Sequence, residues 1–195
     1  MNPTPLRFAM IGTGGISRAH WRGFAARPDA AVLTAACDPN ATALAAFVQE
    51  TGLKDLRTFA DHRAVIRAGG FDAAIITLPH HLHYPVAADF VAAGIPCLVE
   101  KPVTCGLDEA RRLRDLAEQR RVIVASGQNR RFNRDATWIQ RWAQADPANF
   151  GELRTFDLQS WQNVHAYTGG PERTGHWILD RATAGGGVVL SLSIH

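Results

Sequence analysis

The chain has 195 residues, 46% of them hydrophobic, and a formal net charge of +3 at pH 7. A chain of this length buries roughly 70% of the surface that its unfolded form exposes. We therefore expect one hydrophobic core, and the length also allows a small second domain. Arginines and acids alternate between residues 108 and 121, which is typical of a solvated helix face. The charge pattern therefore argues against nucleic acid as a partner.

The cysteines Cys37, Cys97 and Cys105 are too few and too scattered for a disulfide framework or a zinc site. Cys37 and Cys97 lie in apolar runs and are expected in the core. Cys105 has an alternative interpretation as a reactive thiol near a helix start, which we favour less. No apolar run reaches the roughly 18 residues that a membrane span needs, and no targeting segment is evident. We therefore expect a cytoplasmic protein without a membrane partner.

Short, unbroken apolar runs predict the strands. They show no alternation between apolar and polar residues, so both faces of each strand should be buried, as in a parallel sheet between helices. The runs are Leu6–Ile11, Val32–Cys37, Ala73–Leu78, Cys97–Val99 and Val122–Ala125.

Between these runs the apolar residues recur every three or four positions, which predicts amphipathic helices. The helical segments extend over residues 16–24, 44–51, 86–91 and 107–117, and Gly52 and Gly94 lie where helices should end. Strands alternating with helices, joined by right-handed crossovers, predict an α/β fold with a doubly wound parallel sheet.

The pattern changes after Ala125. A helix is predicted over Asn133–Ala145, followed by a partly alternating strand over Glu152–Trp161. A glycine triplet at 185–187 leads into an apolar run, Val188–Ile194. We place a domain boundary at residue 127, so that residues 128–195 form the start of an incomplete α+β open-sheet domain.

A glycine-rich turn directly follows the first predicted strand and opens the first predicted helix. Glycine permits a tight turn and lets the backbone approach a pyrophosphate, whose charge then lies at the helix N-terminus. Asp38 follows the second strand and is placed to accept hydrogen bonds from the adenosine ribose. The alternative, a tight turn with a helix-capping Asp, is less consistent with this context. The predicted cofactor-binding residues of this region are Gly12, Thr13, Gly14, Gly15, Ile16, Ser17 and Asp38.

The residue at position 38 also bears on the choice of cofactor. A carboxylate there repels a 2′-phosphate, and no arginine follows in Pro39-Asn40. We therefore expect NAD as the cofactor, with NADP as the alternative.

Three further motifs occur where strands end. Glu100-Lys101-Pro102 follows the fourth run, Leu78–His83 ends the third, and Gly127–Phe132 follows the fifth. Strand C-termini in such sheets open onto the ligand crevice. By position alone, Glu100 and Lys101 are equally well explained as a solvated ion pair.

This set of motifs, in this order, resembles the glucose–fructose oxidoreductase, inositol dehydrogenase and rhizopine-catabolism (Gfo/Idh/MocA) family of NAD(P)-dependent oxidoreductases. The resemblance covers essentially the whole chain, and its most specific elements are Glu100-Lys101-Pro102 and the Pro-x-x-x-His motif of Pro79–His83. It implies an NAD(P)-binding Rossmann domain in residues 1–127 and a partial substrate and oligomerisation domain in residues 128–195.

The resemblance also implies roles for single residues. Lys101 would contact the substrate hydroxyl and the nicotinamide ribose, and His195 would transfer the proton. His83 would lie at the rim of the cofactor cleft, and Leu78 and Glu100 would complete the cofactor contacts.

The chain departs from the family pattern in three ways. Leu78-Pro79-His80 stands where the family has a Thr-Pro-Asn type sequence, and Ser191 stands where it has an Asp, so His195 lacks an acidic partner. Family members also continue well past this histidine. We therefore expect a truncated chain, whose full-length domain would shape the substrate pocket and a homo-oligomer interface.

Two clusters have competing interpretations. His80, His81 and His83 suggest a metal site, but no carboxylate or cysteine accompanies them at ligand spacing, so no metal is assigned. The aromatic and histidine side chains of the C-terminal part would line a sugar pocket or simply fill an irregular loop; they are Trp161, His165, Tyr167 and Trp177.

The favoured function is hydride transfer between a sugar or polyol alcohol and the nicotinamide. An ordinary lysine titrates near pH 10.4, so we assign proton transfer to His195 and hydroxyl positioning to Lys101. Two alternatives use the same nucleotide fold. One is an NAD-dependent glycosidase, and the other is a catalytically degenerate nucleotide-binding sensor.

Overall fold

The computed structural model describes residues 4–155, 157, 159 and 176–186 of the chain. In this part of the chain six parallel strands form one sheet in the order β3-β2-β1-β4-β5-β6. The chain therefore winds outward from β1 in both directions. This is the doubly wound sheet that the sequence predicts.

The strands match the predicted apolar runs to within a few residues. They are β1 (Leu6–Ile11), β2 (Ala31–Cys37), β4 (Ala73–Ile76), β5 (Cys97–Val99) and β6 (Val124–Ser126).

One strand has no counterpart among the predicted runs: β3 (Arg57–Phe59), which has three residues and lies at one edge of the sheet. Its sequence, Arg-Thr-Phe, has no apolar run, and none of its three residues is buried. Short edge strands with a charged side chain are common, because they discourage pairing with another chain. β3 pairs in parallel with β2, with Phe59 opposite Cys37.

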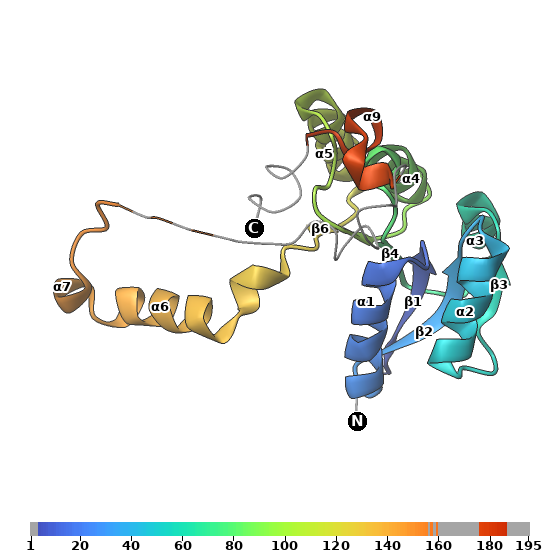
Figure 1. The fold of residues 1–195 in the computed structure, drawn as a ribbon, viewed down its shortest axis with the longest axis horizontal. Coiled ribbons are helices and arrows are strands. Elements are labelled where there is room, and N and C mark those ends of the chain that lie inside the picture. The colour runs from blue at the N-terminus through green and yellow to red at the C-terminus, as the bar shows by residue number, and fades with distance from the viewer. Residues whose placement is uncertain (1–3, 156, 158, 160–175, 187–195) are drawn as a thin grey trace.

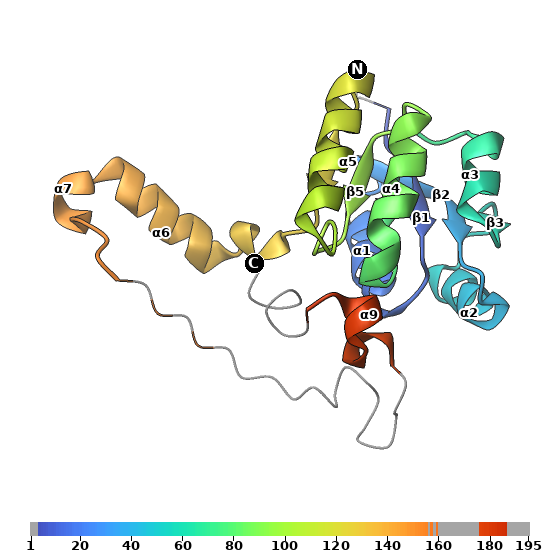
Figure 2. The same cartoon turned by 90° about the horizontal axis from the view of Figure 1, so that it is seen from above.

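Helices cover both faces of the sheet (Figures 1 and 2). The helices α1 (Gly15–Ala26) and α2 (Ala41–Thr51) pack on one face. The opposite face carries α3 (His62–Ala68), α4 (His83–Ala92) and α5 (Leu107–Arg120).

The ends of α2 show how local sequence sets a boundary. The Asn40 side chain accepts hydrogen bonds from the N–H groups of Thr42 and Ala43, which satisfies donors that a helix start leaves free. Gly52 ends the helix with a φ of 65°, as expected for a residue in the left-handed region.

Each face of the sheet has its own core, because successive strand residues point to opposite faces. Met10 packs toward α1 and α2 with Phe47, while its neighbour Ile11 packs toward α4 with Phe90. All four side chains are at most 1% exposed. Burying each contributes roughly 1.5–3 kcal/mol.

After β6 the chain enters a short 3-10 helix, η2 (Asn129–Phe132), and then α6 (Arg134–Ala145) and α7 (Pro147–Phe150). Figure 1 shows α6 and α7 extending away from the sheet. The helix predicted over 133–145 is confirmed.

The strand predicted over Glu152–Trp161 is not formed by the residues of that range that the structure describes, 152–155, 157 and 159. A strand is stabilised by a neighbouring strand, and in the described part of the chain none lies beside this segment. The expected strand Val188–Ile194 lies outside the described residues.

The chain then returns to the sheet as η3 (Trp177–Leu179) and α9 (Arg181–Ala184). α9 contacts the 3-10 helix η1 (His80–Leu82), which follows β4. Within the described residues, no helix is long and apolar enough to cross a membrane.

Candidate cofactor and catalytic site

The strand register brings the sequence motifs together at one edge of the sheet. Ile11 lies opposite both Cys37 and Ile76, Ile76 lies opposite Val99, and Val99 lies opposite Ser126. The residues that follow this row form the C-terminal edge, where ligands bind in doubly wound sheets. They are Gly12, Asp38, Thr77, Glu100 and Gly127.

The first glycine is required by the fold itself. Gly12 has a φ of 96°, and a Cβ added to it would lie 2.6 Å from the carbonyl oxygen of Thr77. Glycine alone adopts this conformation at such close range. The turn after β1 is thereby held against the end of β4.

The next two glycines face open space. A Cβ added to Gly14 or Gly15 would meet nothing within 4 Å, and both residues are exposed. Gly14 is the N-cap of α1, with no side-chain cap and no acid in the first turn of the helix. The first N–H groups of α1 and the positive end of its dipole therefore face open space, and such a helix start attracts anions.

Ser17 and Ile16 lie on different sides of α1. Ser17 is fully buried, and its hydroxyl donates a 2.6 Å hydrogen bond to the carbonyl oxygen of Gly14. A serine therefore permits the close packing expected at this position. Ile16 is 45% exposed and borders an open pocket of about 330 Å³ beside the end of β5.

Asp38 is fixed beside the glycine turn. Its Oδ2 accepts hydrogen bonds from the backbone N–H and the hydroxyl of Thr13, at 2.8 and 2.9 Å, and its Oδ1 accepts the N–H of Asn40 at 2.8 Å. A carboxylate offers about four acceptor positions. About one therefore remains for a further donor such as a ribose hydroxyl.

Glu100 lies between β5 and α1. Its Oε1 is 2.9 Å from Nε2 of His20, and its Oε2 accepts the backbone N–H of Lys101 at 3.2 Å. Burial raises the pKa of Glu100. The hydrogen bond and charge of His20, together with Lys101, outweigh this effect and hold the pKa below its ordinary value. Glu100 is therefore ionised at neutral pH.

The pKa of Lys101 lies below its ordinary value. Burial lowers it, Glu100 raises it, and the guanidinium of Arg130 lowers it again. Arg130 belongs to η2, which follows β6. Low-pKa lysines are suited to hydrogen bonding or proton exchange with a substrate hydroxyl.

His83 is buried between the loops that follow β4 and β5. Its side chain is 1% exposed; Nδ1 lies 2.6 Å from the carbonyl oxygen of Pro102, and Nε2 lies 2.7 Å from that of Leu78. Burial lowers the pKa of this imidazole, despite the two carbonyls. A ring nitrogen can bond a carbonyl oxygen only by donating its N–H, and the ring lies between the two carbonyls, so it ties the loop after β4 to the loop after β5.

The neighbouring histidines are also directed to backbone carbonyls. His80 Nδ1 lies 2.8 Å from the oxygen of Ala184, and His81 Nδ1 lies 3.3 Å from that of Thr183. The ring of Trp177 packs edge-on against His80, with the centroids 4.6 Å apart. In the described part of the chain, no three side chains are grouped as metal ligands.

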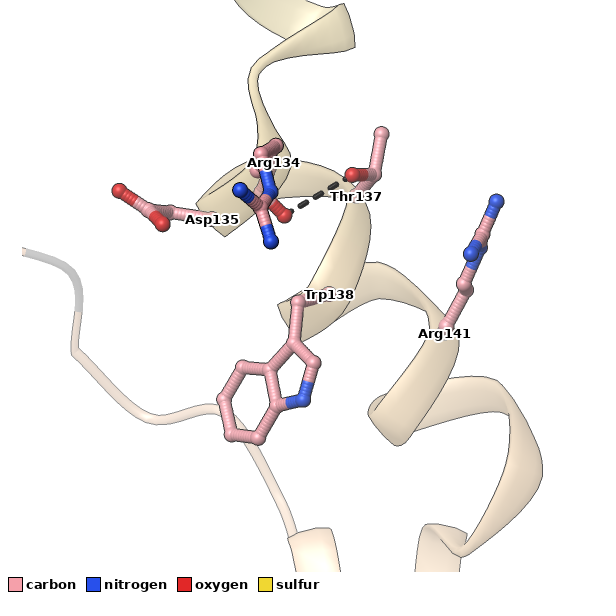
Figure 3. Close-up of a pocket in the computed structure, with 5 residues that line it drawn as sticks. All are labelled: Arg134, Asp135, Thr137, Trp138 and Arg141. Atoms are coloured by element: carbon pink, nitrogen blue, oxygen red, sulfur yellow. Dashed lines mark hydrogen bonds between the residues drawn. The ribbon is translucent and has the colours of Figure 1, made fainter.

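A larger hollow, of about 520 Å³, lies over α6 (Figure 3). Its lining comes from this one helix, and Figure 1 shows α6 pointing away from the sheet. It therefore does not border the strand ends. The lining residues are Arg134, Asp135, Thr137, Trp138 and Arg141.

Two residues of the site had no role assigned from the sequence. His20 is a single histidine within a predicted helix, and Arg130 is one of several arginines in and after the Gly127–Phe132 motif. No local pattern distinguishes either residue from a surface side chain. The expected catalytic His195, together with Ser191, Trp161, His165 and Tyr167, lies outside the described residues.

The fold and this edge define a dinucleotide-binding Rossmann domain. The model of the Gfo/Idh/MocA family, an oxidoreductase family with an NAD-binding Rossmann fold, matches residues 6–128. The chain belongs to this family, and the resemblance drawn from the motifs is confirmed.

Similar proteins include sugar and inositol oxidoreductases. The chain is 34% identical over 129 residues to the rhizopine catabolism protein MocA of Rhizobium meliloti, covering 66% of this chain and 39% of that protein. It is 27% identical over 149 residues to an inositol 2-dehydrogenase of Corynebacterium glutamicum, and this match covers 76% of this chain and 43% of that protein.

Among solved structures, the WlbA dehydrogenase of Bordetella pertussis, in complex with NADH and UDP-GlcNAcA, has a TM-score of 0.68 and 26% identity. The match covers 73% of this chain and 42% of that one. The chain thus spans less than half the length of these relatives.

Proposed function

We propose that this chain carries the cofactor half of an NAD-dependent oxidoreductase that acts on an alcohol of a sugar or polyol. The observation that carries the proposal is the open glycine turn at the start of α1, next to the fixed carboxylate of Asp38 and on the same strand edge as Lys101. Relatives named for inositol and sugar-nucleotide oxidation support this substrate class.

The residues present fit a dinucleotide. The N–H groups around Gly14 and Gly15 would hold the pyrophosphate, and Asp38 would accept a ribose hydroxyl. Its negative charge would disfavour a 2′-phosphate, so NAD is proposed over NADP. When bound, the nicotinamide supplies the hydride acceptor.

Lys101 is proposed to bind the substrate hydroxyl and the nicotinamide ribose. Its lowered pKa favours exchange of a proton with that hydroxyl. His195 is proposed to take the proton in the complete site. Residues beyond about 127 are proposed to begin the domain that binds substrate and joins copies into a homo-oligomer.

NAD binding and turnover test the proposal separately. Calorimetry with NAD and NADP should give binding of NAD at least tenfold tighter. Formation of NADH should be followed at 340 nm with myo-inositol, scyllo-inositol and UDP-N-acetylglucosamine. Binding of NAD without oxidation of any of them by the full-length protein would instead favour a nucleotide sensor. Cleavage of a glycoside without net NADH would favour the glycosidase.

A further inference from the structure

A partly buried pair of side chains, His20 and Glu100, connects α1 to the loop that carries Lys101. His20 lies in the second turn of α1, and Glu100 follows β5. Nε2 of His20 and Oε1 of Glu100 are 2.9 Å apart, and the two side chains are 19% and 12% exposed. The pair is therefore largely shielded from water and more strongly coupled than a surface pair.

The Glu100 carboxylate is held from three sides. His20 contacts Oε1, and the backbone N–H of Lys101 donates to Oε2. On the third side the backbone of Gly127 lies so close that an added Cβ would be 3.0 Å from Oε1. Because an ionised carboxylate only accepts hydrogen bonds, His20 is the donor at Nε2.

The position of the Glu100 carboxylate affects the protonation of Lys101, the next residue along the chain. In the described part of the chain, Glu100 raises the pKa of Lys101 and Arg130 lowers it. Lys101 in turn lowers the pKa of His80, which therefore lies near it. Among the residues that the structure describes, Glu100 is the one acid that shifts the pKa of Lys101. A carboxylate that moved closer to the ammonium would keep Lys101 protonated.

We propose that His20 is a positioning residue for Lys101, because it holds the Glu100 carboxylate against α1 and Gly127 and so prevents it from closing on the Lys101 ammonium. His20 would then couple the helix that binds the pyrophosphate to the lysine that binds the substrate hydroxyl. The role of Lys101 in this inference rests on the proposed function, whereas the effect of His20 on the lysine does not.

The composition of the chain makes the lysine directly measurable. Lys54 and Lys101 are its only lysines, and Lys54 is exposed. Competitive acetylation with acetic anhydride, followed by mass spectrometry, gives the reactivity of Lys101 relative to Lys54 in a single sample. Only the unprotonated amine reacts, so this ratio, measured from pH 7 to 10, reports the pKa of Lys101.

Four variants separate the positioning role from a purely structural one. His20→Ala should lower the ratio at pH 8 about threefold, a shift of about half a pKa unit. His20→Gln, which keeps an N–H donor, should restore most of the wild-type ratio. Glu100→Gln should raise the ratio, and the double variant His20→Ala/Glu100→Gln should match Glu100→Gln, because no carboxylate remains to be positioned.

Circular dichroism and thermal melting check that each variant is folded. If His20→Ala does not fold, His20→Leu, which has a side chain of similar bulk and no donor, takes its place. The proposal is overturned if folded His20→Ala has the same Lys101 to Lys54 ratio as wild type. It is also overturned if His20→Ala lowers this ratio as much in the Glu100→Gln background as it does in the wild-type background. The labelling needs neither NAD nor substrate, so a failure of the proposed oxidoreductase function leaves this measurement intact.

Discussion

Asp38 and Thr13 are joined twice: Oδ2 of Asp38 accepts both the backbone N–H and the hydroxyl of Thr13, at 2.8 and 2.9 Å. The residues are 25 positions apart, at the ends of β2 and β1. These bonds hold the carboxylate in place beside the glycine turn before any ligand arrives. Preorganisation of this kind reduces the ordering cost of binding.

Asp38→Ser should narrow the preference for NAD over NADP. The substitution removes the charge that repels a 2′-phosphate and one acceptor for the ribose, so NAD affinity should fall by about tenfold, roughly 1.4 kcal/mol, while NADP affinity rises. Calorimetry with both nucleotides measures the change. Tighter binding of NADP than NAD by the wild-type chain would contradict the assigned role of Asp38.

Gly14 and Gly12 should respond differently to substitution. Gly14→Val should leave the fold intact, because an added Cβ meets open space, and should abolish NAD binding by blocking approach of the pyrophosphate. Gly12→Ala should destabilise the chain by at least about 1–3 kcal/mol, because the alanine would have to adopt a positive φ and its Cβ would clash with the carbonyl oxygen of Thr77. Thermal melting and calorimetry separate the two effects. Unchanged NAD affinity in Gly14→Val would refute the proposed cradle.

His83→Leu should loosen the connection between the loops after β4 and β5. A buried carbonyl, of Leu78 or Pro102, would lose its donor, which costs about 1–3 kcal/mol. Urea unfolding measures the loss. His81→Leu is the matched control, because His81 is exposed, and it should change stability by less than about 0.5 kcal/mol. Equal effects of the two substitutions would show that His83 does not connect the loops.

Asp72 should contribute to stability in a pH-dependent way. Its hydrogen bond with the Arg7 side chain is the main cause that lowers its pKa to about 2, compared with an ordinary value near 3.9 in the unfolded chain. Between these two pKa values the unfolded chain binds a proton at Asp72, whereas in the folded chain Asp72 stays ionised. The contribution is fully present above about pH 5 and is lost as the pH falls toward 2.

Urea midpoints of wild type and Asp72→Asn, compared between pH 6 and pH 3, test this expectation. The difference between the two proteins should shrink as the pH is lowered. A difference that stays constant over this range would show that the Arg7 contact does not depend on the charge of Asp72.

Phe90→Ala should be strongly destabilising. Phe90 is fully buried between α4 and the sheet, so its loss should cost about 3–5 kcal/mol, including the cavity that remains. Phe132→Ala is the matched control, since Phe132 is 75% exposed. Urea unfolding should show little change for the control. Similar losses for both would mean that Phe90 does not belong to the core.

The strands, the main helices and the glycine turn could be predicted from the sequence because their signals are local. A continuous apolar run, a spacing of three and four, and Gly12–Ser17 between a strand and a helix each fall within a few neighbouring residues. The parallel sheet then places the motifs that follow its strands at one edge. β3 escaped prediction because Arg57–Phe59 has no such signal.

The contacts inside the site were decided by the tertiary structure. His20 meets Glu100 across 80 positions, because β4 and then β5 follow β1 in the sheet and because α1 turns this one histidine toward them. The rotation of α4 likewise directs His83 into the protein. Such pairings depend on strand order and on the packing of each helix against the sheet, and neither can be inferred from the residues adjacent in sequence. The glycine turn and Asp38 could therefore be identified from the sequence, whereas the groups that surround Glu100 and Lys101 could be identified only from the fold.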